Sequence, residues 1–208
     1  MMAIQLKIDR VLQGSFDLQD LNLLFVFQVN CPGCFLYGFP LANKLHDRYQ
    51  AAGLNVLGLS TAFEDFDLNT AANTELLLTQ QQTVGATRRS IGTHYALAID
   101  FPIAVDRLTT GAELATPEQI EFLCKTMSGK DSLANHEREA LRHRVKAYLL
   151  RNSQTSATFT LNNLSGTPSF LLIDGNLQLL DGWFGHISET EAIERIEKHL
   201  CISSASLE

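Results

Sequence analysis

The sequence has few cysteines and an excess of acidic residues, and it contains no long apolar run. Four cysteines in 208 residues are too few for a disulfide scaffold. No stretch approaches the roughly 18 consecutive apolar residues of a membrane span, so we expect no membrane segment. Lys and Arg number 16 against 23 Asp and Glu, and the net charge of −7 excludes a broad basic surface for nucleic acid.

The first residues also lack the apolar core of a signal peptide. We therefore expect a cytoplasmic protein, or a periplasmic one if a leader has been removed. The content of 45% hydrophobic and 19% charged residues is that of a globular chain and excludes disorder. At this length we expect residues 1–208 to form a single domain.

The first third of the chain has the pattern of a strand–helix–strand unit. Alternation over Ile4–Ile8 predicts a short strand, and the apolar run Leu21–Val29 predicts a strand buried on both faces. Cys34–Ala51 has helical spacing, with a kink expected at Pro40. Asn55–Ser60 reads as a second buried strand, so the unit predicts a parallel pair in an α/β fold.

The middle of the chain is mostly helical in pattern. Helical stretches are expected within residues 67–80 and 88–96, followed by a strand at 99–105. Residues 107–157 then predict a helical insertion that packs as an all-helical cap on the core. Its first helix begins at Thr116–Pro117, an N-cap followed by proline, and its second is expected over residues 132–150.

The last third predicts a hairpin and a helix. Ser169–Asp174 and Leu177–Trp183 read as two strands joined by a turn at Gly175–Asn176. A capping box at Ser188 opens the final helix. Together with the first third, these elements predict an α/β fold with a central mixed sheet flanked by helices.

The strongest chemical signal is Cys31-Pro32-Gly33-Cys34, placed where a buried strand meets a helix. The unpaired N–H groups at a helix start stabilise a thiolate, so we expect the more exposed Cys31 to be the nucleophile and Cys34 to resolve the mixed disulfide. Half a zinc site has the same spacing. A zinc site needs a second Cys or His pair, whereas Cys124 and Cys201 each stand alone, so we expect no metal.

A second signal lies far along the chain, in Gly166-Thr167-Pro168-Ser169, just before an apolar strand. With the strand leading into Cys-Pro-Gly-Cys and the segment at residues 55–66, it resembles the thioredoxin superfamily, in particular its TlpA-like and AhpC/TSA-type branch. The resemblance covers about residues 5–106 and 158–201. It implies a thioredoxin-like fold, a cis peptide bond at Pro168 packed against the Cys pair, and a role for the backbone at Thr167 in binding the substrate chain.

The resemblance also implies a thiol–disulfide oxidoreductase that needs no bound cofactor. Its expected partners are protein or small-molecule thiol and disulfide substrates, together with a reductant such as a thioredoxin-type protein or glutathione. Pro32 and Gly33 would belong to the substrate-binding surface. The sequence does not fix whether the pair works as reductant, oxidant or isomerase, because the potential depends on how strongly the thiolate is stabilised.

The sequence departs from the pattern of this superfamily at two positions. Asn30 stands where an aromatic residue usually precedes the first cysteine, and Phe25 stands where thioredoxin has a buried acid. Glu64 or Asp65 could supply the missing proton relay.

Two alternatives stay open. A thiol peroxidase of the same fold would need a hydroxyl residue and a proline ahead of Cys31, where Gln28 and Leu24 stand. A non-catalytic module that binds proteins would be favoured if the Cys pair proved buried. Cys124 falls on the apolar stripe of its predicted helix, and we expect it in the core.

Overall fold

The central element is a mixed sheet, described here from a computed structural model that covers residues 2–128 and 134–205. Within this part of the chain, seven strands lie in the order β1-β9-β8-β3-β4-β5-β2. Strands β3, β4 and β5 are parallel, and the remaining pairings are antiparallel. The bounds are β1 Met2–Ala3, β2 Ile8–Gln13, β3 Leu21–Phe27, β4 Leu54–Ser60, β5 Ile103–Asp106, β8 Ser169–Asp174 and β9 Gln178–Phe184. The expected α/β class with a central mixed sheet is confirmed.

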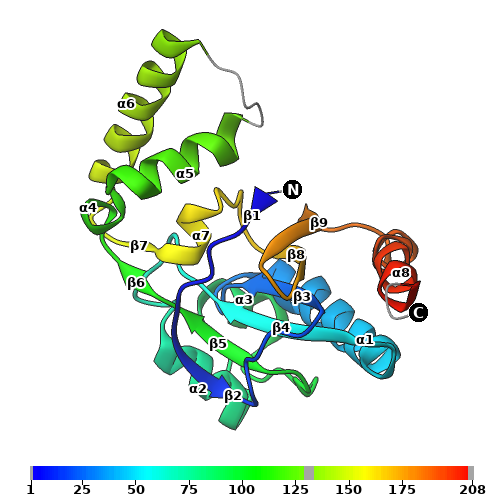
Figure 1. Cartoon of the computed structure of the whole chain (residues 1–208). Coiled ribbons are helices and arrows are strands. Elements are labelled where there is room, and N and C mark those ends of the chain that lie inside the picture. Colours follow the sequence, from blue (N-terminus) through cyan, green and yellow to red (C-terminus); the bar gives the residue numbers. More distant parts are fainter. Residues whose placement is uncertain (1, 129–133, 206–208) are drawn as a thin grey trace.

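Strand β3 lies at the middle of the sheet because every one of its residues is apolar or buried against a neighbour. Its alternate side chains enter two cores. Phe25 and Phe27 join the core on the face covered by α1 (Phe39–Tyr49), α2 (Ala71–Gln80), α3 (Gly85–Ile91) and α8 (Glu189–Ala205). Leu24 and Val26 face the opposite core, which the N-terminal segment helps to close. Figure 1 shows β3 and β4 side by side with α1 alongside them.

The expected strand at Ile4–Ile8 is wrong, although the segment is apolar at alternate positions. Residues 4–7 contact side chains and turns instead of a strand ladder: the Gln5 N–H donates to Asn162 Oδ1 and the Lys7 N–H to Thr158 Oγ1. The chain pairs only at its flanks, in β1 and β2. Strand β2 was not expected because its exposed, mixed side chains have no clear period.

Other boundaries shifted by a few residues for local reasons. Strand β5 begins at Ile103 rather than residue 99, since Pro102 has no N–H for a ladder, although its carbonyl accepts from Gly58 N at 2.8 Å. Helix α3 begins at Gly85 and ends at Ile91, earlier than the stretch 88–96. Helix α2 begins after Thr70, whose hydroxyl accepts from the Asn73 N–H.

The stretch 107–157 is helical over most of its described length, but it is not all-helical. It holds α4 (Gly111–Leu114), α5 (Pro117–Ser128) and α6 (Asn135–Arg151), and its two ends pair as the short strands β6 (Leu108–Thr109) and β7 (Thr155–Ser156). The Thr116 hydroxyl accepts from the Gln119 N–H, as the capping pattern predicted. The expected start of the second helix at Ser132 lies outside the described residues.

Helices α5 and α6 have an apolar core of their own. Leu123 and Cys124 of α5 pack against Val145 and Leu149 of α6, and the floor of this core is α7 (Ala157–Leu161). Figure 1 shows the pair standing out beyond the sheet, with α7 between the pair and the sheet. The segment therefore does not lie over the core as a cap. Cys124 is buried in it, as expected.

No helix in the described part of the chain is both long enough and apolar enough to cross a membrane.

Candidate active site

The Cys pair lies at the end of the central strand. After β3, the chain passes through Asn30 into a turn in which the Cys34 N–H donates to the Cys31 carbonyl at 3.0 Å. Cys31 is half-buried, whereas Cys34 is completely covered. Only the first sulfur can therefore meet a partner from solvent, and the second lies directly behind it.

The helix that begins here opens with a π-helical turn, Cys34–Gly38, in which the Phe39 N–H donates to the Cys34 carbonyl. Pro40 has no N–H to give to the preceding turn, so the wider turn accommodates the proline that the sequence placed inside the helix. The irregularity in this helix is the π-helical turn, which ends two residues before Pro40, where a kink was expected from the sequence. It lies within the segment that carries Cys34.

The two thiols have opposite acidities. The strongest effect on Cys31 is a hydrogen bond from the Cys34 thiol, which stabilises the Cys31 thiolate, and burial opposes this effect. Thr167 and the backbone N–H groups of Cys34 and Gly33 stabilise the thiolate further. As a result, the pKa of Cys31 falls to about 6. Burial and the neighbouring Cys31 raise the pKa of Cys34 well above its usual value. At neutral pH, Cys31 is therefore mostly a thiolate, and Cys34 is a thiol.

Thr167 and Pro168 lie against the pair, as the sequence pattern predicted. The Thr167–Pro168 peptide bond is cis. The Cys31 sulfur lies 3.4 Å from the Thr167 carbonyl oxygen, to which its protonated form donates, and a Cβ built on Gly33 would be 3.6 Å from Pro168 Cδ. Pro32 and Gly33 are accessible beside them. Cys31, Pro32, Gly33 and Thr167 are thus at least partly exposed around the accessible sulfur, whereas Cys34 and Pro168 are buried beneath them.

Glu64 and Asp65 follow β4 and are both exposed. Asp65 Oδ2 accepts from Asn30 Nδ2 at 2.7 Å, and Asn30 Oδ1 accepts from the Ala86 N–H at 2.6 Å. The structure therefore links Asp65 to the residue before Cys31.

Sequence reasoning missed the role of Gln28, which it weighed only as a mismatch to the peroxidase pattern. Gln28 is almost completely buried. It contacts both Thr167 and the loop after β4. The sequence did contain a signal. Gln28 directly follows the apolar run of β3, in a stretch expected to be buried on both faces, and a buried amide needs hydrogen-bond partners. Phe25, in the position of the missing acid, stacks on Phe170 inside the aromatic core.

The loop after β9 closes the other side of the site. The Gly185 N–H donates to the Pro168 carbonyl at 2.8 Å, and the ring of His186 lies 4.4 Å from that of Tyr37, in the π-helical turn. The Ile187 N–H donates to the Tyr37 hydroxyl at 3.3 Å. Tyr37 therefore fixes this loop to the helix that carries Cys34.

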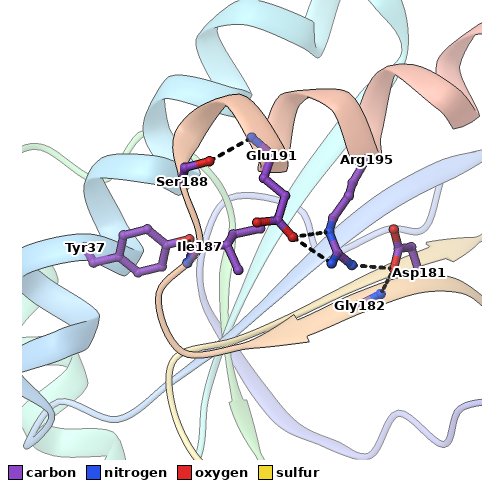
Figure 2. A network of polar contacts seen from close by, with 7 residues as sticks. All are labelled: Tyr37, Asp181, Gly182, Ile187, Ser188, Glu191 and Arg195. Atoms are coloured by element: carbon purple, nitrogen blue, oxygen red, sulfur yellow. Dashed lines mark hydrogen bonds and ion pairs between the residues drawn. The ribbon is translucent and has the colours of Figure 1, made fainter.

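The same loop is fixed at its other end by the start of α8. Figure 2 shows Ser188 Oγ accepting from the Glu191 N–H, as the capping pattern predicted, and Arg195 bridging Glu191 and Asp181 of β9. The Arg195 Nη1–Asp181 Oδ1 distance is 3.0 Å. These contacts attach α8 to the strand that pairs with the cis-proline strand, and they hold the site's border without touching either thiol.

Within the described residues, no three His, Cys, Asp or Glu side chains gather as metal ligands would. The side chain of Cys201 lies outside the described residues.

No protein-family model and no curated protein sequence matches this chain. Solved structures do match along almost the whole chain. A thioredoxin-like superfamily protein is 23% identical over 96% of each chain, with a TM-score of 0.60. A thiol-disulfide isomerase from Corynebacterium glutamicum is 20% identical over 95% of each chain, with a TM-score of 0.58.

A thioredoxin-like protein in its oxidised form is 14% identical over 97% of this chain and 95% of its own, with a TM-score of 0.50. The chain has a thioredoxin-like fold. At these identities the likeness shows the fold alone. In this fold, the Cys31–Cys34 pair stands at the start of the helix that follows the central strand, with Pro168 next to Gly33.

Proposed function

We propose that this protein is a thiol–disulfide oxidoreductase of the TlpA-like or AhpC/TSA-type branch. The observation that carries the proposal is the pairing of a half-exposed Cys31 of low pKa with a buried Cys34 of high pKa, next to a cis-proline. Two cysteines with only a structural role would not need one of their sulfurs to be accessible to solvent and ionised. The likeness in fold to a thiol-disulfide isomerase supports the same reaction class.

The proposed reaction has two exchanges. The Cys31 thiolate attacks one sulfur of a substrate disulfide, so the substrate S–S bond breaks and the other substrate sulfur leaves as a thiolate that takes a proton. The Cys34 thiol then loses its proton and attacks the Cys31 sulfur. The mixed disulfide breaks, the second substrate sulfur leaves, and the Cys31–Cys34 disulfide forms. The substrate gains two electrons and the protein loses two.

The docking surface in this proposal is Thr167 with Pro168, bordered by Pro32 and Gly33. The Thr167 carbonyl oxygen lies 3.4 Å from the accessible sulfur, and a Cβ on Gly33 would be 4.0 Å from that sulfur and 3.6 Å from Pro168. The substrates are protein or small-molecule disulfides and thiols, and a thioredoxin-type protein or glutathione returns the pair to the dithiol. A proton relay through Glu64 or Asp65 stays a prediction. The chain is proposed to be one domain over residues 1–208, with 107–157 as its insertion.

The test is reduction of a protein disulfide by the full-length chain with a thiol regenerating system. We expect wild type to be active and Cys31→Ala to be inactive. Cys124→Ala is the matched control, because Cys124 is also buried but packs in the α5–α6 core, and it should retain activity. Equilibration of the pair with glutathione then assigns direction. A potential near about −270 mV indicates a reductant, and a value well above it indicates an oxidant or isomerase. A wild type that neither reduces nor oxidises any disulfide would refute the proposal.

A further inference from the structure

Gln28 is a buried amide immediately behind the redox pair. Its side-chain Nε2 donates to the Glu64 carbonyl at 3.4 Å, and its Oε1 accepts from the Thr167 hydroxyl at 3.2 Å. Burial raises the pKa of Cys34, and a hydrogen bond from the Gln28 backbone lowers it in part. Gln28 thus connects the end of β3, the loop after β4 and the residue before the cis-proline.

The amide can hold only one orientation. Its Nε2 faces a carbonyl, which only accepts, so Oε1 must face Thr167 and act as the acceptor. The Thr167 hydroxyl has a single proton to donate. Thr167 also contacts the pair, since its carbonyl oxygen lies 3.4 Å from the Cys31 sulfur, and hydrogen bonding by its side chain lowers the pKa of both Cys31 and Cys34. The amide oxygen and the thiolate therefore compete for one proton.

We propose that Gln28 is a positioning residue that acts through Thr167, its amide oxygen drawing the hydroxyl proton away from the thiolate of the redox pair. The inference rests on the proposed function, since it concerns the nucleophile of that reaction. Phe25 leaves no buried acid at this strand. A neutral amide–hydroxyl pair therefore stands behind the thiols and adjusts their acidity without bringing in a charge.

Removal of the amide has a distinctive consequence. With an apolar residue at position 28, the Thr167 hydroxyl loses its competing acceptor and can turn to donate to the thiolate. A hydrogen bond to the charged form lowers a pKa, so Cys31 should become more acidic. Removal of the hydroxyl should have the opposite effect, because the thiolate loses a donor. Once the hydroxyl is gone, the identity of residue 28 should no longer matter.

The experiment measures the rate at which iodoacetamide alkylates Cys31 in the reduced protein between pH 4 and 9, with the Cys31 peptide quantified by mass spectrometry. The variants are Gln28→Leu, Thr167→Val, the double variant and Thr167→Ser. We expect Gln28→Leu to shift the profile to lower pH, and half a unit would raise the thiolate fraction at pH 5 about threefold. Thr167→Val should shift the alkylation profile to higher pH, and the double variant should have the same profile as Thr167→Val. The profile of Thr167→Ser should be that of wild type.

The matched control is Gln13→Leu. Gln13 is also a partly buried amide that bridges carbonyls, those of Ile99 and Phe101, but it lies on β2. It should leave the Cys31 profile unchanged. If Gln28→Leu does not fold, Gln28→Met removes the same polar atoms while keeping the length of the side chain.

Two outcomes would overturn the inference. One is an unchanged or upward-shifted profile in Gln28→Leu or Gln28→Met, and the other is a double variant whose shift is the sum of the two single shifts. Alkylation needs no disulfide substrate, so these outcomes are separate from failure of the proposed function. That failure would appear as an absence of disulfide exchange by wild type, whatever the order of the profiles.

Discussion

The Cys31 sulfur lies 3.4 Å from the backbone carbonyl oxygen of Thr167, although 136 residues separate the two along the chain. Antiparallel pairing of β3 with β8, which places Val26 opposite Ser169, produces this contact. In this register, the C-terminal end of β3 and the N-terminal end of β8 lie next to each other at the same edge of the sheet. A partly exposed thiol is thereby placed beside the backbone of Thr167.

The unequal burial of the two sulfurs predicts unequal roles in exchange. Cys34→Ser should attack a protein disulfide and then retain the substrate as a mixed disulfide through Cys31, because no thiol is left to release it. Cys31→Ser should form no such adduct, since Cys34 is covered and protonated. Non-reducing gels after incubation with an oxidised protein substrate measure this. Adducts in Cys31→Ser but not in Cys34→Ser would reverse the roles.

The acidity of Cys31 depends first on its neighbour. Because the Cys34 thiol stabilises the Cys31 thiolate most strongly, Cys34→Ala should raise the pKa of Cys31 from about 6 toward the usual value near 8.5. The pH profile of Cys31 alkylation should move upward with it. Cys124→Ala is the control and should not move it. An unchanged profile in Cys34→Ala would mean that the backbone N–H groups dominate instead.

Asp106 predicts a pH effect on stability. Burial raises the pKa of its carboxyl, against hydrogen bonds from the Thr158 and Phe159 N–H groups and the Thr61 hydroxyl. A raised folded-state pKa contributes stability that is present below the unfolded value near 3.9 and is lost as the pH rises through the folded value.

Denaturant unfolding of wild type and Asp106→Asn from pH 4 to 7 measures this effect. The free energy of unfolding of wild type, relative to the variant, should rise as the pH falls. The exposed Asp100→Asn should show no such trend relative to wild type. If the free energy of unfolding of wild type, relative to Asp106→Asn, decreased as the pH was lowered, the assignment would be wrong.

The apolar core of α5 and α6 should be separable from the redox site. Leu149 is completely buried there, and Leu149→Ala should cost about 2–5 kcal/mol through the cavity it leaves. Amide hydrogen exchange should speed up in α5, α6 and α7, while the Cys31 alkylation profile stays as in wild type. The adjacent Leu150 is 55% exposed, and Leu150→Ala should change stability by less than about 0.5 kcal/mol. A changed Cys31 profile in Leu149→Ala would show that the two regions are coupled.

The local sequence pattern was sufficient to predict those elements whose formation depends on neighbouring residues in the chain. The apolar run at Leu21–Val29 identified the central strand, and the hydroxyls of Thr116 and Ser188 identified two helix starts that the structure confirms. The cis bond before Pro168 followed from a resemblance in motif rather than from propensity, and it too is confirmed.

Only the tertiary structure decided what each segment pairs with. Residues 4–7 alternate like a strand, yet the N–H groups of Gln5 and Lys7 donate to the side chains of Asn162 and Thr158 and not to a neighbouring strand. Similarly, the stripes of α5 and α6 predicted buried faces but not that α7 would be their floor. A period specifies which face of an element is buried, and it does not specify the partner that buries it.

The same division holds in the site. The sequence by itself determined that two thiols stand one turn apart at a helix start, with a proline strand elsewhere in the chain. The fold decided that Cys34, more than the helix N–H groups, acidifies Cys31, and that Gln28 and Thr167 lie behind the pair. Hydrogen bonds act over about 3 Å, so their strength depends on contacts between distant strands that no spacing along the chain encodes.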